Sequence, residues 1–575
     1  MPQAMHGIGV SSGIAIGKVR ILQHGQVDLP EYAITPAQVE SEIARFREAV
    51  KQAQAQLLSL HQRIPEGTPV EIATFIDTHL LMLQDTPLSR EPEELIRSQL
   101  CNAEWALKLQ QDALVKVFEE MDDPYLRTRR DDVEHVVRRV LHLLLNKGSA
   151  DHVIEDEEPR IILAVDISPS ELVQLHHHRI AALVTERGGP LSHTAILARA
   201  LGIPAIVGVP HIHQYLFDDE MVVVDGRRGA LLAGLDAAGY EFYRKCQRAE
   251  QKARNELRKL RDKPSQTRDG VAITLQANIE LPEDIAAMRK AGASGVGLYR
   301  TEFLFMNRTS PPDEEEQYQA YRQMVKRLNG APLTIRTLDL GADKEMIPGQ
   351  ANCRNPALGL RAIRLCLKEP ELFRPQLRAI LRASAHGPVK LLIPMLTTIA
   401  ELRPVRQLLA EARAELSAEN RRFDAQLPIG AMIEVPAAAL CADSFARELD
   451  FLSIGTNDLI QYTLATDRID ETVNHLYDPL NLAVLRLIRD TIRAGADAGI
   501  PVSLCGEMAG DPAYTRLLLG MGLTDFSMPA AALLQVKHIV TTTELKPLRK
   551  EVDKLLRYHH AEEIAAGLER LNRAN

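Results

Sequence analysis

A histidine at position 193 stands where a phosphoryl group could be carried. A short apolar run over 181–185 predicts a buried strand, and a pair of glycines after it allows a tight turn. Ser192 can cap a helix over 194–201, which Gly202 would end. His193 would then lie on the first turn of a helix, where free backbone N–H groups and the helix dipole favour a phosphate. From these residues alone, the alternative is a surface histidine beside a helix cap.

The second half of the chain alternates between strand and helix patterns from about residue 269. Eight strands are expected, over 273–279, 295–304, 333–338, 389–395, 430–435, 451–454, 502–504 and 525–528. Each gap between them has room for a helix. Eight parallel strands separated by helices predict a (β/α)8 barrel, whose active site lies where the strands end.

Side chains suited to phosphate chemistry follow these strands. Glu434 and Asp458 can hold Mg²⁺, which prefers oxygen ligands and shares them with a substrate phosphate. Arg300 and Arg336 can clamp a phosphate with their planar guanidinium groups. Cys505 follows the seventh strand, and taken alone it would be a buried core cysteine. Each residue alone could be a structural tie, but their gathering at one rim predicts phosphoryl transfer by positioning and charge neutralisation.

The first half of the chain must form the domain that carries His193. Small and β-branched residues with glycines over 7–22 predict strands and tight turns, and this character returns after 149. Between them the chain reads as helical, with apolar residues from Val39 to Ile64 at alternating four- and three-residue steps, a pattern typical of a packing seam. Further helices are expected over 70–83, 91–121 and 131–145. The simplest account is a helical bundle inserted into a β/α domain.

The totals narrow the class of protein. A chain of 575 residues is too long for one core, so several domains are expected. The net charge of −9 argues against nucleic acid as the main partner and suits a basic protein. Six scattered cysteines without Cys-x-x-Cys spacing fit a reducing cytoplasm rather than a disulfide framework. No signal core and no run of membrane-spanning length is present, so we expect a cytoplasmic protein without membrane insertion.

Several stretches resemble Enzyme I of the phosphoenolpyruvate-dependent phosphotransferase system. Gly-Gly-Pro-Leu-Ser-His193-Thr is similar to its phosphohistidine segment, although Leu191 replaces a usual threonine. Gly-Leu-Tyr-Arg-Thr-Glu-Phe, Ile-Arg-Thr-Leu-Asp, Ile-Glu-Val-Pro-Ala and Leu-Cys-Gly-Glu-Met are similar to its phosphoenolpyruvate-binding barrel. The most specific run is Phe451-Leu-Ser-Ile-Gly-Thr-Asn-Asp-Leu-Ile-Gln-Tyr-Thr. The resemblance covers nearly the whole chain.

The resemblance implies where the domains of the chain begin and end. The implied parts are a β/α phosphohistidine (swivelling) domain at 1–30 plus 148–235, an inserted helical domain at 31–147, a helical linker at 236–264, and a barrel and dimerisation domain at 265–575. The inserted helices would bind the phosphocarrier protein HPr. His79 lies in a segment similar to those helices, and from the residues alone it is equally a helix-face histidine with no special role.

The resemblance also implies roles for residues at the rim of the barrel. Glu434 and Asp458 would be the Mg²⁺ ligands, and Cys505 the acid that protonates the pyruvate enolate. The implied phosphoenolpyruvate ligands are Arg300, Arg336, Arg361, Asn457, Arg468 and, from a motif with alanine at 342 where the family usually has glycine, Lys344.

The implied activity is that of a dimeric phosphotransferase. The phosphoryl group of phosphoenolpyruvate would pass to His193 and then to a histidine of HPr, releasing pyruvate, in sugar uptake or in the nitrogen-related regulatory branch. A dikinase or phosphoenolpyruvate synthase would need an ATP-binding domain, for which no Gly-rich loop is present. The alternative from another class is a phosphoenolpyruvate-sensing regulatory protein with an inactive barrel.

Overall fold

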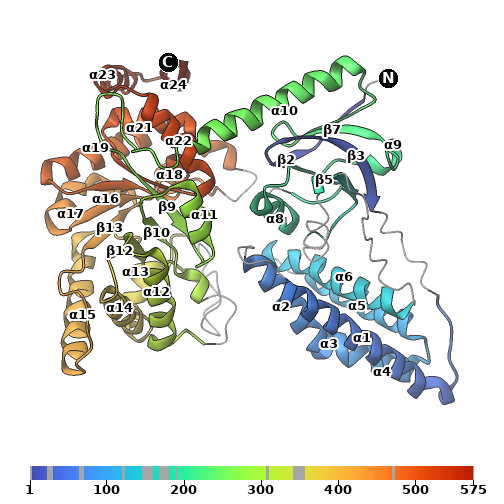
Figure 1. Cartoon of the computed structure of the whole chain (residues 1–575). Coiled ribbons are helices and arrows are strands. Elements are labelled where there is room, and N and C mark those ends of the chain that lie inside the picture. Colours follow the sequence, from blue (N-terminus) through green and yellow to red (C-terminus); the bar gives the residue numbers. More distant parts are fainter. Residues whose placement is uncertain are drawn as a thin grey trace. The chain divides into compact units, whose positions relative to one another are not determined.

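The protein folds into two compact units, Met1–Ala253 and Arg254–Asn575 (Figure 1). The computed structural model describes residues 3–22, 30–63, 70–119, 124–145, 159–167, 172, 180–189, 192–305, 310–340, 357–468 and 473–573. In these ranges no helix combines the length and the apolar character needed to cross a membrane.

The first unit contains an eight-stranded sheet with the strand order β1-β8-β7-β3-β4-β5-β6-β2. Its strands are β1 (Gln3–His6), β2 (Ile8–Ser11), β3 (Ile14–Leu22), β4 (Arg160–Ala164), β5 (Ile180–Thr185), β6 (Ala205–Val207), β7 (Met221–Asp225) and β8 (Ala230–Ala233). β3 pairs with β4 in parallel, with Val19 opposite Ile161. The segments on either side of the helical region therefore join in one sheet, which confirms that the bundle is inserted into a β/α fold.

The inserted bundle consists of helices α1 (Val39–Arg63), α2 (Val70–Gln84), α3 (Thr86–Ser89), α4 (Glu91–Gln99), α5 (Ala103–Glu119) and α6 (Pro124–Leu144). The apolar seam expected from Val39 to Ile64 is buried where the structure describes it: Ile43 and Phe46 are each 1% exposed, and Ala53 and Leu57 are 0% exposed, while Ile64 lies outside the described residues. Helix α6 starts at Pro124, earlier than the expected 131, since a proline fits the first turn of a helix.

The single helix expected over 91–121 is wrong, because the chain breaks between α4 and α5. Leu100 takes a left-handed backbone conformation, with φ of 51°. Asn102 explains the break: its side chain accepts a hydrogen bond from the Tyr32 N–H at 3.3 Å and donates to the Pro30 carbonyl at 2.6 Å. These ties hold the chain against the segment that precedes the bundle. They are long-range contacts, and a helical pattern carries no sign of them.

The part of the first unit that the structure describes also contains α8 (His193–Leu201) and α9 (Ile212–Tyr215), and α10 (Ala237–Arg258) begins in this unit and ends beyond its boundary at Ala253. Helix α10 has no buried residue, as its dense charge predicts. The helix ends before the end of the helical linker implied at 236–264, because the chain turns after Arg258.

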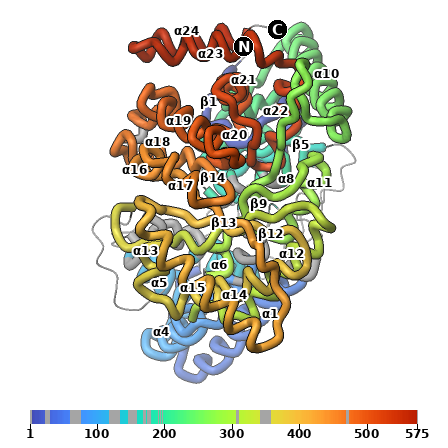
Figure 2. The backbone as a smooth tube through the Cα atoms, turned by 90° about the vertical axis from the view of Figure 1, so that its left-hand side faces the viewer, coloured from blue at the N-terminus to red at the C-terminus, as the bar shows by residue number. Residues whose placement is uncertain are grey.

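The second unit is a closed barrel of eight strands in the order β9 to β16, all paired in parallel (Figures 1 and 2). The strands are β9 (Thr274–Ile279), β10 (Val296–Tyr299), β11 (Leu333–Arg336), β12 (Val389–Ile393), β13 (Ile429–Ile433), β14 (Phe451–Ile454), β15 (Val502–Leu504) and β16 (Asp525–Met528). The eight expected strands are thus confirmed. The expected strand over 295–304 is shorter, since the chain turns at Arg300 and forms a 3₁₀ turn, η2 (Glu302–Leu304).

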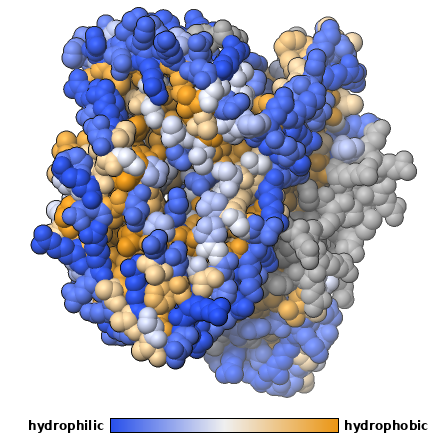
Figure 3. All heavy atoms as spheres, turned by 60° about the vertical axis from the view of Figure 1, so that its left-hand side comes forward, coloured by the Kyte–Doolittle hydropathy of each residue, from blue (hydrophilic) through white to orange (hydrophobic). Residues whose placement is uncertain are grey.

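Helices surround the barrel strands (Figures 1 and 2). Their bounds are α11 (Asp284–Ala291), α12 (Glu314–Leu328), α13 (Ala362–Lys368), α14 (Pro370–Ser384), α15 (Ile399–Ala418), α16 (Pro436–Leu440), α17 (Ala442–Glu448), α18 (Thr456–Leu464), η3 (Asn474–Leu476), α19 (Leu482–Ala498), α20 (Glu507–Gly510), α21 (Pro512–Met521), α22 (Ala530–Thr542), α23 (Leu545–Leu555) and α24 (Ala561–Arg573). On the face of the barrel drawn in Figure 3, hydrophobic residues show as patches between hydrophilic ones.

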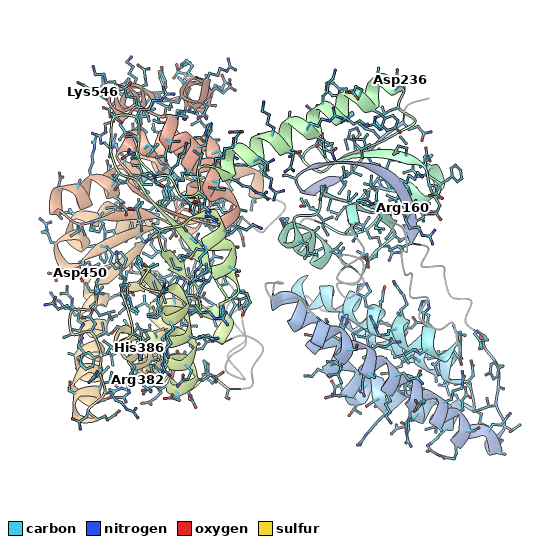
Figure 4. All side chains as sticks on the ribbon, viewed as in Figure 1. Arg160, Asp236, Arg382, His386, Asp450 and Lys546 are labelled. Atoms are coloured by element: carbon cyan, nitrogen blue, oxygen red, sulfur yellow. The ribbon has the colours of Figure 1, made fainter. Side chains whose placement is uncertain are left out.

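An ion-pair network joins α12, α14 and α15 at the side of the barrel. Arg378 contacts Glu314, Glu415 and Glu419, and Arg382 contacts Glu314 at 2.7 Å. Figure 4 labels Arg382 and the nearby His386, which precedes β12. The network therefore lies toward the amino ends of the strands, on the side of the barrel away from the rim where active sites lie, and we expect it to serve stability.

Candidate active site

The barrel brings the predicted site residues to the carboxyl ends of its strands. Arg336 is the last residue of β11, and Arg300, Glu434 and Cys505 directly follow β10, β13 and β15. Asp458 lies in the first turn of α18, which begins two residues after β14. Because parallel strands in a barrel end at one rim, residues from five strands converge there.

Two arginines at this rim are held by buried carboxylates. Arg336 lies 3.1 Å from a Glu302 oxygen and 2.8 Å from an Asp339 oxygen, and its side chain is 11% exposed. Arg361 lies 2.9 Å from the other Asp339 oxygen and donates to the Tyr462 hydroxyl at 3.3 Å. The guanidinium groups are therefore fixed before any ligand arrives, which is the preorganisation that a phosphate clamp requires.

The pKa of Asp339 lies below its ordinary value. Burial raises this pKa, but the positive charges of Arg336 and Arg361 outweigh burial. Asp339 is therefore ionised at neutral pH and bridges the two arginines.

Replacement Asp339→Asn is expected to destabilise the barrel by about 3 kcal/mol at neutral pH, because it leaves buried positive charge without its partner. Since the pKa of Asp339 is lowered on folding, its contribution is full above about pH 3.9, the ordinary aspartate value, and is lost as the pH falls through the folded value. Urea unfolding of Asp339→Asn and of the unmodified protein should show that the difference between their free energies of unfolding becomes smaller from about pH 7 to about pH 3. A difference that stays constant over this range would contradict the assignment.

Glu434 is buried at the rim, directly after β13. It is 1% exposed, and its Oε1 accepts a hydrogen bond from the Met395 N–H at 2.7 Å. Met395 has a φ of 59°, an uncommon value for a residue other than glycine, and strain of this kind is often found beside functional groups. A side chain at Gly455 would place its Cβ 2.8 Å from the Glu434 Oε2, so only glycine fits there.

Glu434 and Asp458 fit a divalent cation. Burial raises the pKa of Glu434 well above its ordinary value, and the negative charge of Asp458 raises it further, so a cation between the two carboxylates would relieve their repulsion. Within the described ranges, no cluster of three or more His, Cys, Asp or Glu residues could hold a metal. A pair of carboxylates is nonetheless enough for an ion that keeps waters and takes substrate phosphate oxygens as its other ligands.

Cys505 is fixed inside the mouth of the barrel. It is 3% exposed, and its Sγ accepts a hydrogen bond from the Ser453 hydroxyl at 3.3 Å. Its carbonyl accepts from the Asn278 side chain at 2.9 Å. Burial raises the pKa of the Cys505 thiol, so it stays protonated at neutral pH, as a proton donor must.

The other predicted substrate ligands differ in how they are held. The Asn457 side chain and Glu507 exchange two hydrogen bonds, of 3.1 and 2.9 Å, which fix the amide at the rim. Arg468 is exposed after the end of α18, and its backbone N–H donates to the Gln461 side chain at 3.4 Å. Lys344 lies outside the described residues.

The backbone around His193 forms the expected glycine turn and helix start. β5 is followed by Gly188, whose φ of 102° is accessible mainly to glycine. Helix α8 begins at His193, and the hydroxyl of its N-cap, Ser192, accepts from the Ala195 N–H at 3.3 Å. Gly202 ends the helix in a left-handed conformation. His193 is therefore on the first turn of a helix, at the positive end of its dipole.

His79 lies on α2, inside the bundle. It is 3% exposed, and its ring centroid is 6.4 Å from that of His135 on α6. The ring is therefore packed inside the bundle and is not presented on its surface. Its predicted part in partner binding stays a prediction.

Sequence reasoning assigned no role to Glu302 and Asp339, the carboxylates that hold the arginines, or to the hydroxyl groups of Ser453 and Tyr462. The first two stand within short motifs that follow strand candidates, which was an available signal. The two hydroxyl groups contact residues that lie far away in the sequence, so no local sequence pattern indicates these contacts.

Family models of phosphoenolpyruvate-utilising enzymes match the chain in three stretches. The PEP-binding domain matches residues 254–545, the N-terminal domain residues 6–129, and the mobile domain residues 156–229. The chain is 46% identical over 585 residues to a phosphoenolpyruvate-protein phosphotransferase of Cupriavidus necator, with 100% of both chains covered. It is 38% identical over 574 residues to the protein of that name from Listeria innocua, with 99% of each covered. A solution structure of Enzyme I is 28% identical, with 43% of this chain and 99% of that one covered and a TM-score of 0.37.

Proposed function

Because the chain belongs to the family of phosphoenolpyruvate-protein phosphotransferases, enzymes of the phosphotransferase system, we propose that it carries the phosphoryl group of phosphoenolpyruvate on His193. The observation that carries this proposal is the preorganised rim of the barrel: two fixed arginines, two carboxylates and a protonated thiol at the ends of neighbouring strands. The position of His193 at the start of α8 supports its role as the acceptor.

In the proposed first step, Arg300, Arg336 and Arg361 hold the phosphate and carboxylate of phosphoenolpyruvate, assisted by Asn457 and Arg468. A His193 ring nitrogen attacks the phosphorus, and the bond from phosphorus to the enol oxygen breaks, leaving its electron pair on that oxygen. Mg²⁺, which we propose that Glu434 and Asp458 hold, would neutralise the phosphate charge when bound.

The resulting enolate must gain a proton at its methylene carbon. We propose that the Cys505 Sγ–H supplies it, giving pyruvate and a thiolate that solvent reprotonates. The buried, protonated thiol and the fixed strand end around it support this role. In the second step, a histidine of an HPr-type carrier attacks the phosphorus, and the bond to His193 breaks.

Replacement Cys505→Ser is expected to separate phosphate transfer to His193 from protonation of the pyruvate enolate. Labelled phosphate should still reach His193, whereas exchange of the pyruvate methyl hydrogens with solvent deuterium should fall by about 10²–10⁴-fold, the usual worth of a positioned acid. The matched control is Cys441→Ser, because Cys441 is an exposed cysteine of the same unit. Methyl exchange at the normal rate in Cys505→Ser would assign the proton to another group.

The remaining parts of the proposal concern partners and organisation. We propose that the inserted bundle binds the carrier and that the chain forms a homodimer through the barrel, as the resemblance to Enzyme I implies. The proposed division is a phosphohistidine domain at 1–30 plus 148–235, helices at 31–147, a linker at 236–264 and a barrel at 265–575. The free cysteines among the described residues support a reducing cytoplasm as the site of action.

The experiment that tests the proposal is incubation with labelled phosphoenolpyruvate and Mg²⁺, with and without a purified HPr-type carrier. Label that appears on His193 and moves to the carrier supports both steps. Absence of label in the presence of bound phosphoenolpyruvate would favour the sensing protein with an inactive barrel. ATP-dependent labelling would favour a dikinase.

A further inference from the structure

A polar connection runs from the inserted bundle to the helix that begins with His193. His135 on α6 places its Nε2 3.1 Å from the Asp166 Oδ2, and the two side chains are 8% and 28% exposed. Asp166 lies two residues after the end of β4, in the β/α fold. This contact therefore joins the two parts of the first unit through a charged acceptor.

Asp166 passes the connection on to α8. Its other oxygen, Oδ1, accepts a hydrogen bond from the Ile167 N–H at 2.8 Å. The carbonyl of Ile167 accepts in turn from the Thr194 Oγ1 at 3.0 Å, and Thr194 is 6% exposed. Thr194 is the neighbour of His193 in the chain, so the first turn of α8 is tied through Asp166 to His135.

The connection runs through a packed apolar region. Ile167 and Val136 are each 1% exposed, Ala195 is 0% exposed, and all belong to one core cluster shared by the bundle and the sheet. Burial raises the pKa of Asp166, but the hydrogen bond and charge of His135 outweigh it, so the pKa lies below its ordinary value and the carboxylate is ionised at neutral pH. A hydrogen bond to an ion in such surroundings is stronger and more rigid than one in water.

We propose that His135 and Asp166 are positioning residues for the second phosphoryl transfer, from His193 to the carrier, and not for the first. This inference rests on the proposed function. In the first transfer the donor binds the barrel, and the orientation of the bundle does not enter. In the second transfer the acceptor docks on the bundle, so the geometry between α6 and α8 sets the distance from His193 to the acceptor.

The size of the expected effect follows from that geometry. A displacement of about 1 Å between reacting groups costs about 10²-fold in rate. Loss of the contact between His135 and Asp166 should therefore slow the second transfer by about 10–10²-fold at saturating carrier. The carrier concentration for half-maximal rate should stay within about threefold, because the docking surface itself is unchanged.

The test uses the full chain with replacements at both ends of the contact. His135→Leu removes the donor, whereas His135→Gln restores an N–H near the position of the imidazole Nε2. Asp166→Ala removes the acceptor, and the double variant tests whether the two act as one unit. His142→Leu is the matched control, since His142 lies about two turns further along the same helix.

Two readouts are needed, one without any carrier. Hydrogen exchange of peptides covering 192–201 should show lost protection in His135→Leu and Asp166→Ala, and normal protection in His135→Gln and His142→Leu. Rapid-quench kinetics should show that labelling of His193 by phosphoenolpyruvate is unchanged in all variants. Transfer to a purified HPr-type carrier should be slow in His135→Leu, in Asp166→Ala and to the same extent in the double variant.

Two results would overturn the inference. One is protection and transfer in His135→Leu equal to those in His142→Leu, with the unmodified protein active. The other is an equal loss in both transfers, which would indicate general damage to the fold. If the unmodified protein passes no label to the carrier, the proposed second step is wrong, whatever the variants do. In that case hydrogen exchange still tests the inference, because normal protection of 192–201 in His135→Leu would show that His135 does not hold α8.

Discussion

His193→Gln is expected to abolish phosphate incorporation from phosphoenolpyruvate. Glutamine keeps hydrogen-bonding groups in the first turn of α8 and lacks a nucleophilic ring nitrogen, so no phosphorylated form can accumulate. Phosphate transfer to a carrier should vanish with it, while binding of phosphoenolpyruvate to the barrel should persist. The measurement is incorporation of labelled phosphate, with ligand binding followed on the same preparation.

The control for this variant is His211→Gln, which alters an exposed histidine of the same unit. It should label normally. Retained labelling of His193→Gln, located by mass spectrometry to another residue, would mean that a different group carries the phosphate and that the start of α8 serves a structural purpose.

Glu434→Gln is expected to lower the rate of His193 labelling by at least about 10³-fold without unfolding the barrel. The amide oxygen can still accept the hydrogen bond from the Met395 N–H, so the local structure is kept. Only one carboxylate then remains for the cation, and transfer loses the charge neutralisation on which it depends. Because Glu434 and Asp458 repel one another, loss of one charge should leave the metal-free protein at least as stable as before.

Two measurements test whether Glu434→Gln loses metal binding and keeps its stability. Urea unfolding in the presence of a chelator should show equal or greater stability for Glu434→Gln, and titration with Mn²⁺ should show weaker binding. Glu544→Gln, which alters an exposed carboxylate of the barrel half, should change neither quantity. Normal labelling by Glu434→Gln, with metal binding intact, would place the cation elsewhere.

The barrel could be predicted from sequence because its buried parallel strands are short apolar runs at regular spacing. The strand expected over 295–304 was too long, because the chain turns at Arg300 and forms a 3₁₀ turn. The break at Leu100 could not be predicted either, since the side chain of Asn102 creates it through contacts with a distant segment. Local periodicity thus finds elements, while their ends depend on contacts that form only in the folded chain.

The site residues likewise fall into those that could be predicted from the sequence and those that could not. Residues that follow strands, such as Arg336, Glu434 and Cys505, could be predicted because the barrel fixes where strand ends meet. The bridging role of Asp339 could not be predicted, because it depends on Arg361, which is brought to the rim at the N-cap of α13. The contact between His135 and Asp166 likewise joins residues on either side of the inserted region, and only the packed core reveals it.

The central claim is that one histidine links the barrel to a protein acceptor. It is tested most directly by following labelled phosphoenolpyruvate in rapid-quench samples and locating the label by mass spectrometry. The account predicts label first on His193 and then on the carrier histidine, with pyruvate released in the first phase. Label that reaches the carrier without ever residing on His193 would contradict it.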